Sequence, residues 1–150
     1  MSIKQQLETD LKTAMLDGNK TLVTTLRGLK SAILYVEVAR GEREKGLSDA
    51  EITVIFMKEA KKRQESADLY IQGGSTEKSD AELAEKLIIE KYLPAQMSED
   101  KLNSIVDEVA ESLGGITKET MGIAIGKVKA ITGPGVDGGR IAVMIKARIQ

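Results

Sequence analysis

The sequence predicts an all-α protein with a larger N-terminal domain of about four helices and a small C-terminal domain of three helices. Apolar residues recur at helical spacing in one segment after another, and each of these segments has a helical start signal. No hairpin signal separates the segments. A chain of 150 residues can support such a fold, because a chain of that size buries about 70% of its unfolded surface.

The first two helices are predicted over residues 2–18 and about 20–39. Ser2 and Gln5 form a capping box that opens the first helix, and Asp17-Gly18 ends it. The second helix is apolar on two opposite faces, so we expect it to be covered on both sides and to lie centrally. One face holds Leu22, Leu26, Leu29, Ile33 and Val36, and the other holds Val23, Leu34 and Val38.

The third helix is predicted to begin after Ser48 and to end at Gly73-Gly74. Ser48 and Glu51 form a second capping box directly before a long apolar pattern of helical period. Residues 52–55 include a β-branched run that resembles a strand. The cap and the length of the helical pattern outweigh that run, so we predict a helix.

The fourth helix and a domain boundary are predicted between residues 79 and 98. A third capping box, Ser79 with Glu82, predicts the start of this helix. Pro94 ends it, because the residue before a proline leaves the α region. We therefore expect domains at residues 1–94 and 95–150.

Three short helices are predicted in the C-terminal domain, beginning near Ser98, Thr117 and Asp137. Residues 133–138, just before the last helix, spell G-x-G-x-x-G, a pattern typical of dinucleotide sites. That fingerprint requires a preceding strand and a βαβ unit, and the sequence predicts neither. We interpret these residues as a turn followed by an Asp cap.

Composition excludes several classes of site. Without Cys or His, the chain has no thiol nucleophile, no disulfide, no imidazole base and no zinc site built from those ligands. Aromatic residues make up 3% of the chain, which leaves few platforms for stacking single-stranded bases. The apolar runs are too short to span a membrane and no export signal is recognisable. We expect a soluble, cytoplasmic protein that needs no cofactor or metal and does not act on a membrane.

The last thirty residues are the most basic region of a chain whose 22 Lys and Arg nearly balance 23 Asp and Glu. Residues 121–150 carry five basic groups and one acidic group, so an anionic partner would have to be recognised here. Two glycines four residues apart share one face of the predicted helix there, which allows another helix or a nucleic-acid backbone to approach. Helix packing is the commoner reason for such a strip. The candidate phosphate-binding residues are Gly122, Gly126, Lys127, Lys129, Arg140 and Lys146.

The cations of the N-terminal domain are secondary candidates. Arg27 is expected on the second apolar face of its helix, paired with a carboxylate such as Glu37 or one on another helix. Arg63 is expected to face inward in a partly buried pair with Glu59 at i, i+4. Three lysines point outward beside it, where solubility is their ordinary role. The secondary candidates for binding are Arg27, Lys58, Lys61 and Lys62.

Two stretches of the chain resemble the GatB/YqeY family. Residues 57–66 read Met-Lys-Glu-Ala-Lys-Lys-Arg-Gln-Glu-Ser and precede Tyr70, and residues 90–97 read Glu-Lys-Tyr-Leu-Pro-Ala-Gln-Met. The remaining matches fall in the expected order and are Leu26-Arg27, Glu37, Met121-Gly122 with Gly126, and Asp137-Gly138. The resemblance spans essentially the whole chain and indicates a free-standing YqeY-like protein.

The resemblance implies binding rather than catalysis. Such proteins are similar to the tail domain of the B subunit of the tRNA-dependent amidotransferase, and a related module is appended to some glutaminyl-tRNA synthetases. In the amidotransferase the chemistry belongs to other domains, while the tail helps to hold the tRNA. We therefore expect a non-catalytic tRNA-binding accessory module that contacts folded tRNA through its C-terminal domain.

Two alternative functions remain open. The first is an interaction adaptor that docks on aminoacyl-tRNA synthetase or amidotransferase subunits without touching RNA. The second is a carbon–nitrogen ligase with glutamine as amido donor, the activity that the family name suggests. The ligase is the less favoured alternative, because the chain has no Cys nucleophile, no nucleotide motif and no recognisable Ser–Ser–Lys arrangement.

Overall fold

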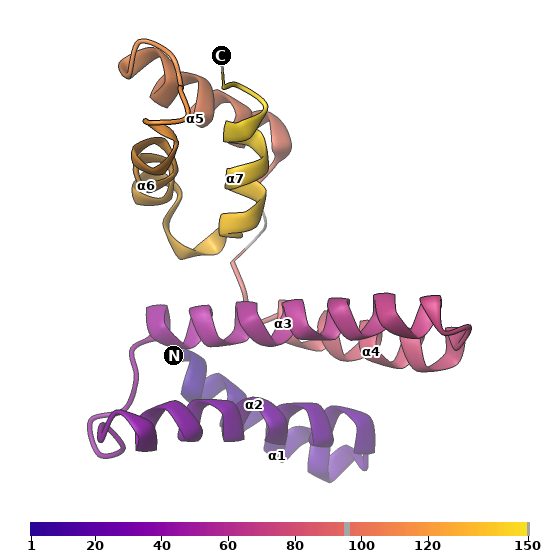
Figure 1. Cartoon of the computed structure of the whole chain (residues 1–150). Helices are drawn as coiled ribbons and strands as arrows, with labels where there is room; N and C mark the ends of the chain where they lie inside the picture. Colours follow the sequence, from indigo (N-terminus) through magenta and orange to yellow (C-terminus); the bar gives the residue numbers. More distant parts are fainter. Residues whose placement is uncertain (95–96, 150) are drawn as a thin grey trace. The chain divides into compact units, whose positions relative to one another are not determined.

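The computed structural model describes residues 1–94 and 97–149, and these residues form an all-α fold, as predicted (Figure 1). The Ala95 and Gln96 positions of the resemblance lie outside the described residues. By its contacts the chain divides into two compact units, Met1–Pro94 and Ala95–Gln150, called here the N-terminal unit and the C-terminal unit. Each unit has its own hydrophobic core.

The N-terminal unit consists of two helical hairpins, α1 (Ile3–Asp17) with α2 (Lys20–Ala39) and α3 (Asp49–Gln72) with α4 (Thr76–Glu90) (Figure 1). Both predicted capping boxes that open α1 and α3 are confirmed, because the Ser side chain and the Glu or Gln side chain each satisfy a free backbone N–H. The core between the hairpins is aliphatic apart from one aromatic ring. Its buried residues are Leu7, Leu11, Ala14, Leu26, Leu29, Ile33, Leu47, Ile52, Phe56, Ala60 and Ile89.

Tyr92 closes this unit just after α4. Its ring packs edge-on against Phe56, with ring centroids 5.8 Å apart and planes at 78°. Its hydroxyl donates a hydrogen bond of 2.5 Å to Oδ2 of Asp10 on α1. Burial and this carboxylate raise the pKa of Tyr92 well above its usual value. The end of the unit is therefore tied to its first helix.

Helix α2 differs from the prediction on its second apolar face. Leu34 and Val38 are 42% and 58% exposed, so within the described residues this face is covered only at Val23, which is partly buried against the core. Arg27 is exposed on the same side. The predicted pair with Glu37 is wrong, because Glu37 is buried and bonded to Lys4 and the Leu47 N–H, and no ion pair forms at Arg27 within the described residues.

Glu37 is 2% exposed and is held by two donors from distant parts of the unit. The ammonium of Lys4 donates to Glu37 Oε2 at 2.7 Å, and the backbone N–H of Leu47 donates to the same oxygen at 3.2 Å. A buried carboxylate requires such partners. The pair joins the start of α1 to the loop that connects α2 and α3.

Arg63 faces the interior of the α3–α4 hairpin, as predicted, but its partners lie on α4. Its Nε atom lies 3.0 Å from Glu85 Oε2 and 3.9 Å from Glu82 Oε2. Glu59 instead pairs with Lys62 at 3.4 Å, so the predicted Glu59–Arg63 pair is wrong. Carboxylates from a neighbouring helix lie closer to the guanidinium than the carboxylate one turn away.

The predicted start of α4, with Ser79 as its cap, is four residues too late, because the observed cap is Ser75. The helix begins at Thr76, and Ser79 is 1% exposed within it rather than acting as its cap. Glu82 faces Arg63 instead of the backbone N–H of Ser79. The Ser-x-x-Glu pattern is thus used for packing between helices here.

The C-terminal unit packs three helices, α5 (Glu99–Ser112), α6 (Met121–Thr132) and α7 (Gly138–Lys146), around a second aliphatic core. Ser98 and Asp137 cap α5 and α7 as predicted. Helix α6 begins later than predicted, because Thr117 and Thr120 form a turn. The Thr117 N–H donates to the Thr120 hydroxyl oxygen at 2.8 Å, and the Thr120 N–H donates to the Thr117 hydroxyl oxygen at 3.3 Å. The buried core residues are Leu102, Val106, Val109, Ile116, Ala124, Val128, Val136, Ile141 and Ile145.

The segment that spells G-x-G-x-x-G is a short 3₁₀ turn, η1 (Gly133–Gly135), followed by the capped start of α7. Gly133 adopts a φ of 71°, which favours glycine. Helix α6 rather than a strand precedes the turn. The turn interpretation is therefore confirmed and the dinucleotide fingerprint is excluded.

Candidate nucleic-acid interface

The two glycines of α6 lie on its exposed face. At 100° per residue, Gly122, Gly126 and Lys129 fall within an arc of about 60°. A Cβ atom added at either glycine would meet no atom within 4 Å, so the backbone of α6 is bare along this strip. Helix packing, the commoner reason for such spacing, does not explain the strip within the described residues.

Lys129 reaches from α6 to the start of α7. Its Nζ atom lies 3.0 Å from the position that a Cβ atom would take at Gly138, and its Cε atom lies 3.1 Å from it. A side chain at Gly138 would require the end of the Lys129 side chain to shift by a few tenths of an ångström. The ammonium therefore lies close to the backbone N–H groups of the first turn of α7, where the helix dipole also favours an anion.

Helix α7 repeats the pattern of α6 on its own exposed face. Gly139, Val143 and Lys146 have the same 0, 4, 7 spacing as Gly122, Gly126 and Lys129, and all six residues except Val143 are Gly or Lys. Val143 is 69% exposed, and Gly139 and Lys146 are also exposed. Each helix thus places a lysine two turns after an exposed glycine.

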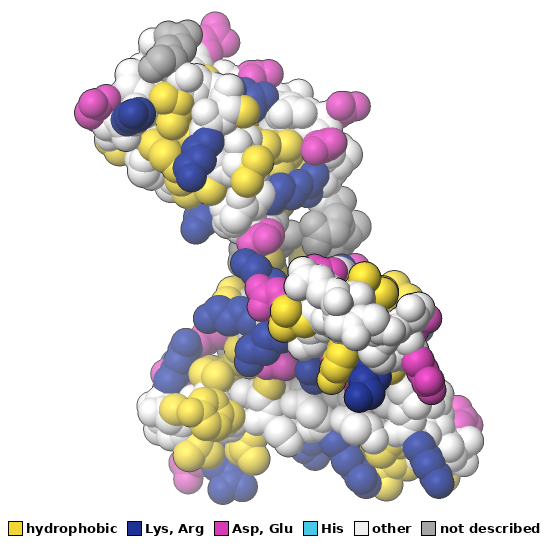
Figure 2. Space-filling model, turned by 45° about the vertical axis from the view of Figure 1, so that its right-hand side comes forward, with side chains coloured by type: hydrophobic (Ala, Val, Ile, Leu, Met, Phe, Trp, Pro, Cys, Tyr) yellow, Lys and Arg dark blue, Asp and Glu magenta, His cyan; other side chains and the backbone are white. Residues whose placement is uncertain are grey.

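Lys127 and Lys146 are exposed, like Lys129. Within the described residues, no ion pair forms at the ammonium of Lys127 or of Lys146. The ordinary role of a lysine near a helix C-terminus is to offset the helix dipole, and Lys129 and Lys146 also lie in last turns. Figure 2 shows Lys and Arg side chains interspersed with hydrophobic side chains on one face of this unit.

Arg140 has a structural contact that the sequence did not indicate. It is partly buried, and its Nη1 donates a hydrogen bond of 3.1 Å to the backbone carbonyl of Met97, ahead of α5. Arg148 is similarly engaged, with Asp107 at 2.8 Å and with the Asn103 side chain at 2.9 Å. The surface available to a phosphate therefore depends chiefly on the three lysines.

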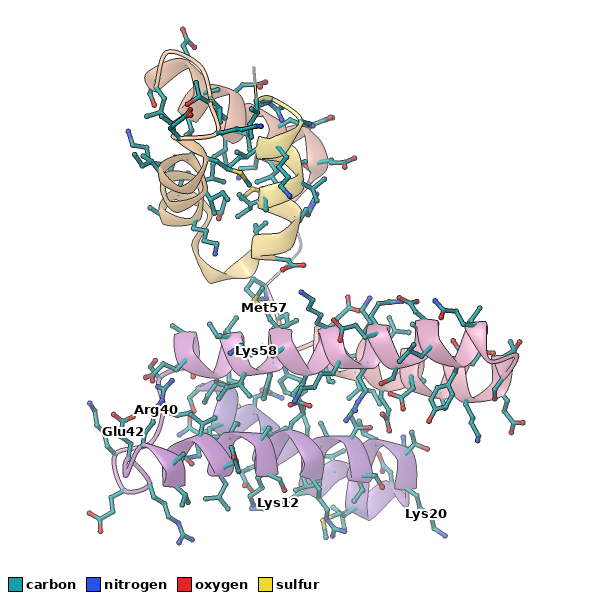
Figure 3. The ribbon with its side chains drawn as sticks, in the orientation of Figure 1. Lys12, Lys20, Arg40, Glu42, Met57 and Lys58 are labelled. Atoms are coloured by element: carbon teal, nitrogen blue, oxygen red, sulfur yellow. The ribbon has the colours of Figure 1, made fainter. Side chains whose placement is uncertain are left out.

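The secondary candidates belong to the N-terminal unit, whereas the glycine-containing face belongs to the C-terminal unit. Lys58 and Lys61 are exposed on α3, and Lys62 pairs with Glu59. Figure 3 shows Lys58 on α3 and Arg40 at the end of α2, beside a groove between these two helices that the sequence did not reveal. No local sequence signal marks that groove, because it depends on how two helices from different hairpins pack together.

The described residues provide no cluster of three or more acidic side chains arranged to hold a metal ion. None of the helices in the described part of the chain is both long and apolar enough to cross a membrane. The arrangement instead offers charged and hydrogen-bonding groups on exposed helix faces. The protein is thus an all-α protein of two units, a helical N-terminal unit and a three-helix C-terminal unit that carries a glycine-containing basic face.

The chain belongs to the YqeY-like family. The family model described as Yqey-like protein matches residues 4–149, which is nearly the whole chain. No match was found among curated proteins. The family assignment agrees with the resemblance expected from residues 57–66 and 90–97.

Proposed function

We propose that this protein is a non-catalytic accessory module that binds folded tRNA through the basic glycine-containing face of its C-terminal unit. The observation that carries the proposal is the bare backbone at Gly122 and Gly126, beside Lys129 of α6, whose side chain extends to the start of α7. A nucleic-acid backbone can approach a helix closely only where side chains do not intervene. Lys127, Lys129 and Lys146 supply positive charge around that surface.

Contacts to the RNA backbone are favoured over contacts to bases. The C-terminal unit contains no Phe, Tyr or Trp, so it offers no aromatic platform on which an unpaired base could stack. Folded RNA presents ordered phosphates and 2′-hydroxyl groups that are recognised by shape. With few cationic contacts, the affinity should be about 10⁻⁶–10⁻⁴ M at physiological salt.

Binding isotherms with total tRNA at several salt concentrations test the proposal. The double variant Lys129→Ala with Lys146→Ala should bind more weakly, and the slope of log affinity against log salt should fall by up to about two. The matched control is Lys101→Ala with Lys118→Ala, which removes the same charge from exposed positions elsewhere in the unit. The control should leave the slope almost unchanged.

A third variant separates close approach from charge. Gly126→Gln adds a neutral side chain where a Cβ atom has open space, so the fold should persist while the bulk blocks the strip. We expect weaker tRNA binding with an unchanged far-UV spectrum. The proposal would be refuted if the Lys129→Ala, Lys146→Ala double variant and Gly126→Gln both bound tRNA as tightly as the unaltered protein. It would also be refuted if the unaltered protein bound no tRNA, and that result would favour the adaptor function.

A further inference from the structure

A groove of about 470 Å³ lies between α2 and α3 on the N-terminal unit. Its apolar surface comes from both helices and from the residue that precedes the cap of α3. Leu47 is buried, whereas Tyr35 and Val54 are 77% and 40% exposed. The other apolar residues that line it are Ala32, Val36 and Ile55. An exposed aromatic side chain beside an apolar groove is typical of an interaction site.

The charges around this groove are unequal. Arg40 pairs with Glu51 at 2.5 Å, and Lys62 pairs with Glu59 at 3.4 Å. Lys58 also lines the groove, and no carboxylate forms an ion pair with it within the described residues. Figure 3 shows Arg40 and Lys58 on the two helices that form the groove. A carboxylate on a bound partner would therefore complement Lys58.

The two helices that line the groove favour a helical segment as its ligand. Both walls are helices whose backbone groups are bonded internally, so an extended strand would find no edge with which to pair. A helical segment satisfies its own backbone and needs to present only side chains. From Glu51 to Lys62 the groove follows twelve residues of α3, a rise of about 16 Å, which matches roughly three turns of a guest helix.

We propose that the α2–α3 groove docks an amphipathic helix of a partner protein, with aliphatic side chains at i, i+3 or i+4, and i+7 and a carboxylate facing Lys58. The apolar side chains cover Tyr35 and Val54, and the carboxylate supplies the missing charge partner. This site lies on the N-terminal unit and is separate from the tRNA-binding face proposed above. Neither proposal depends on the other.

The test uses the full chain labelled with ¹⁵N and two synthetic helical peptides. Both have about 14 residues and the same three leucines on one face, but flanking residues are Glu in one peptide and Lys in the other. The Glu peptide should bind with sub-millimolar affinity and shift backbone signals mainly in residues 32–40 and 51–62. The Lys peptide should bind about fivefold more weakly.

Substitutions test whether the peptides bind in this groove and whether Lys58 determines the preference for Glu. Lys58→Glu should reverse the preference between the peptides, and Lys61→Glu, on an exposed position outside the lining, is the control that should not. Tyr35→Ala should weaken both peptides without unfolding the chain, because its side chain is largely exposed. Equal affinity of the two peptides, or no shifts in the groove at 1 mM peptide (about the weakest binding that the proposal allows), would overturn it.

Two competing occupants give different results. A second copy of the chain would make the groove signals depend on protein concentration without peptide and would give a dimer in analytical ultracentrifugation. RNA would shift the same signals when tRNA is added and would leave the peptides unbound. Either result would overturn the assignment of a partner helix.

Discussion

Removal of the Lys4 ammonium tests whether the buried Glu37 carboxylate is a stabilising junction. In Lys4→Ala, Glu37 keeps its hydrogen bond from the Leu47 N–H but loses the cation 2.7 Å away. Breaking a fully buried pair costs about 3–5 kcal/mol. Because the Lys4 side chain is 46% exposed and water can replace part of the interaction, we expect a loss of about 1–2 kcal/mol.

Thermal and urea unfolding, followed by far-UV circular dichroism, measure this loss. A change of that size should lower the melting temperature of a unit of this length by roughly 5–10 °C. The control is Lys30→Ala, which breaks the Lys30–Glu8 pair, whose side chains are 54% and 42% exposed. Exposed pairs contribute about 0–1 kcal/mol. If Lys4→Ala and Lys30→Ala destabilise the protein equally, the buried carboxylate does not depend on its cation and the reasoning fails.

Three further predictions concern other helices. Arg63→Ala should lower stability by about 1–3 kcal/mol in urea unfolding, because it leaves Glu82 and Glu85 facing one another, and an unchanged transition midpoint would contradict this. Gly126→Ala should raise the stability of the C-terminal unit by about 0.5–1 kcal/mol, since the added Cβ meets open space in a helix interior; a lower melting temperature would show that the strip is covered. Hydrogen bonds from Ser48, together with Arg40, hold the pKa of Glu51 below its usual value of 4.5, so its contribution to stability is present above that pH and is lost as the pH falls through the lowered value. Glu51→Gln should therefore flatten the acid side of a stability–pH profile, and identical profiles for the two proteins would refute the assignment.

The sequence predicted helices well where the signal was local. The capping boxes at Ser2 and Ser48 satisfy backbone groups within four residues, so no distant contact decides them. The same Ser-x-x-Glu pattern at Ser79 does not cap α4, because Ser79 is buried within the helix and Glu82 faces Arg63 of α3. A four-residue pattern cannot distinguish these uses, since packing against α3 determines which applies.

Helical spacing predicts on which side of a helix a side chain lies, but not which residue it contacts. It placed Arg63 on the inner side of α3 correctly, yet its carboxylates come from α4, whose register with α3 the sequence does not specify. It also identified the apolar residues Leu34 and Val38 of α2 without showing whether anything covers them. Pairing between distant segments decides both questions.

For the candidate interface too, the sequence predicts which residues share a helix face but not whether that face is exposed. The spacing of Gly122 and Gly126 put them on one face, but only the arrangement of α5, α6 and α7 leaves that face bare. The contact of Lys129 with the start of α7 depends on a turn between two helices. The hydrogen bond from Arg140 to Met97 spans 43 residues and had no local signal.

The hydrogen bond between Tyr92 and Asp10 has a consequence for the order in which a nascent chain can acquire its structure. It joins residues 82 positions apart, so the core around Phe56 is completed only after the last residues of the N-terminal unit have been synthesised. Until then the first hairpin exposes the aliphatic surface that α3 and α4 later cover. The C-terminal unit, whose buried core begins at Leu102, needs no residue from the earlier part of the chain to complete that core. During synthesis the two hydrophobic cores are therefore completed one after the other. The first requires contacts between residues far apart in the sequence, and the second requires only contacts between residues closer together.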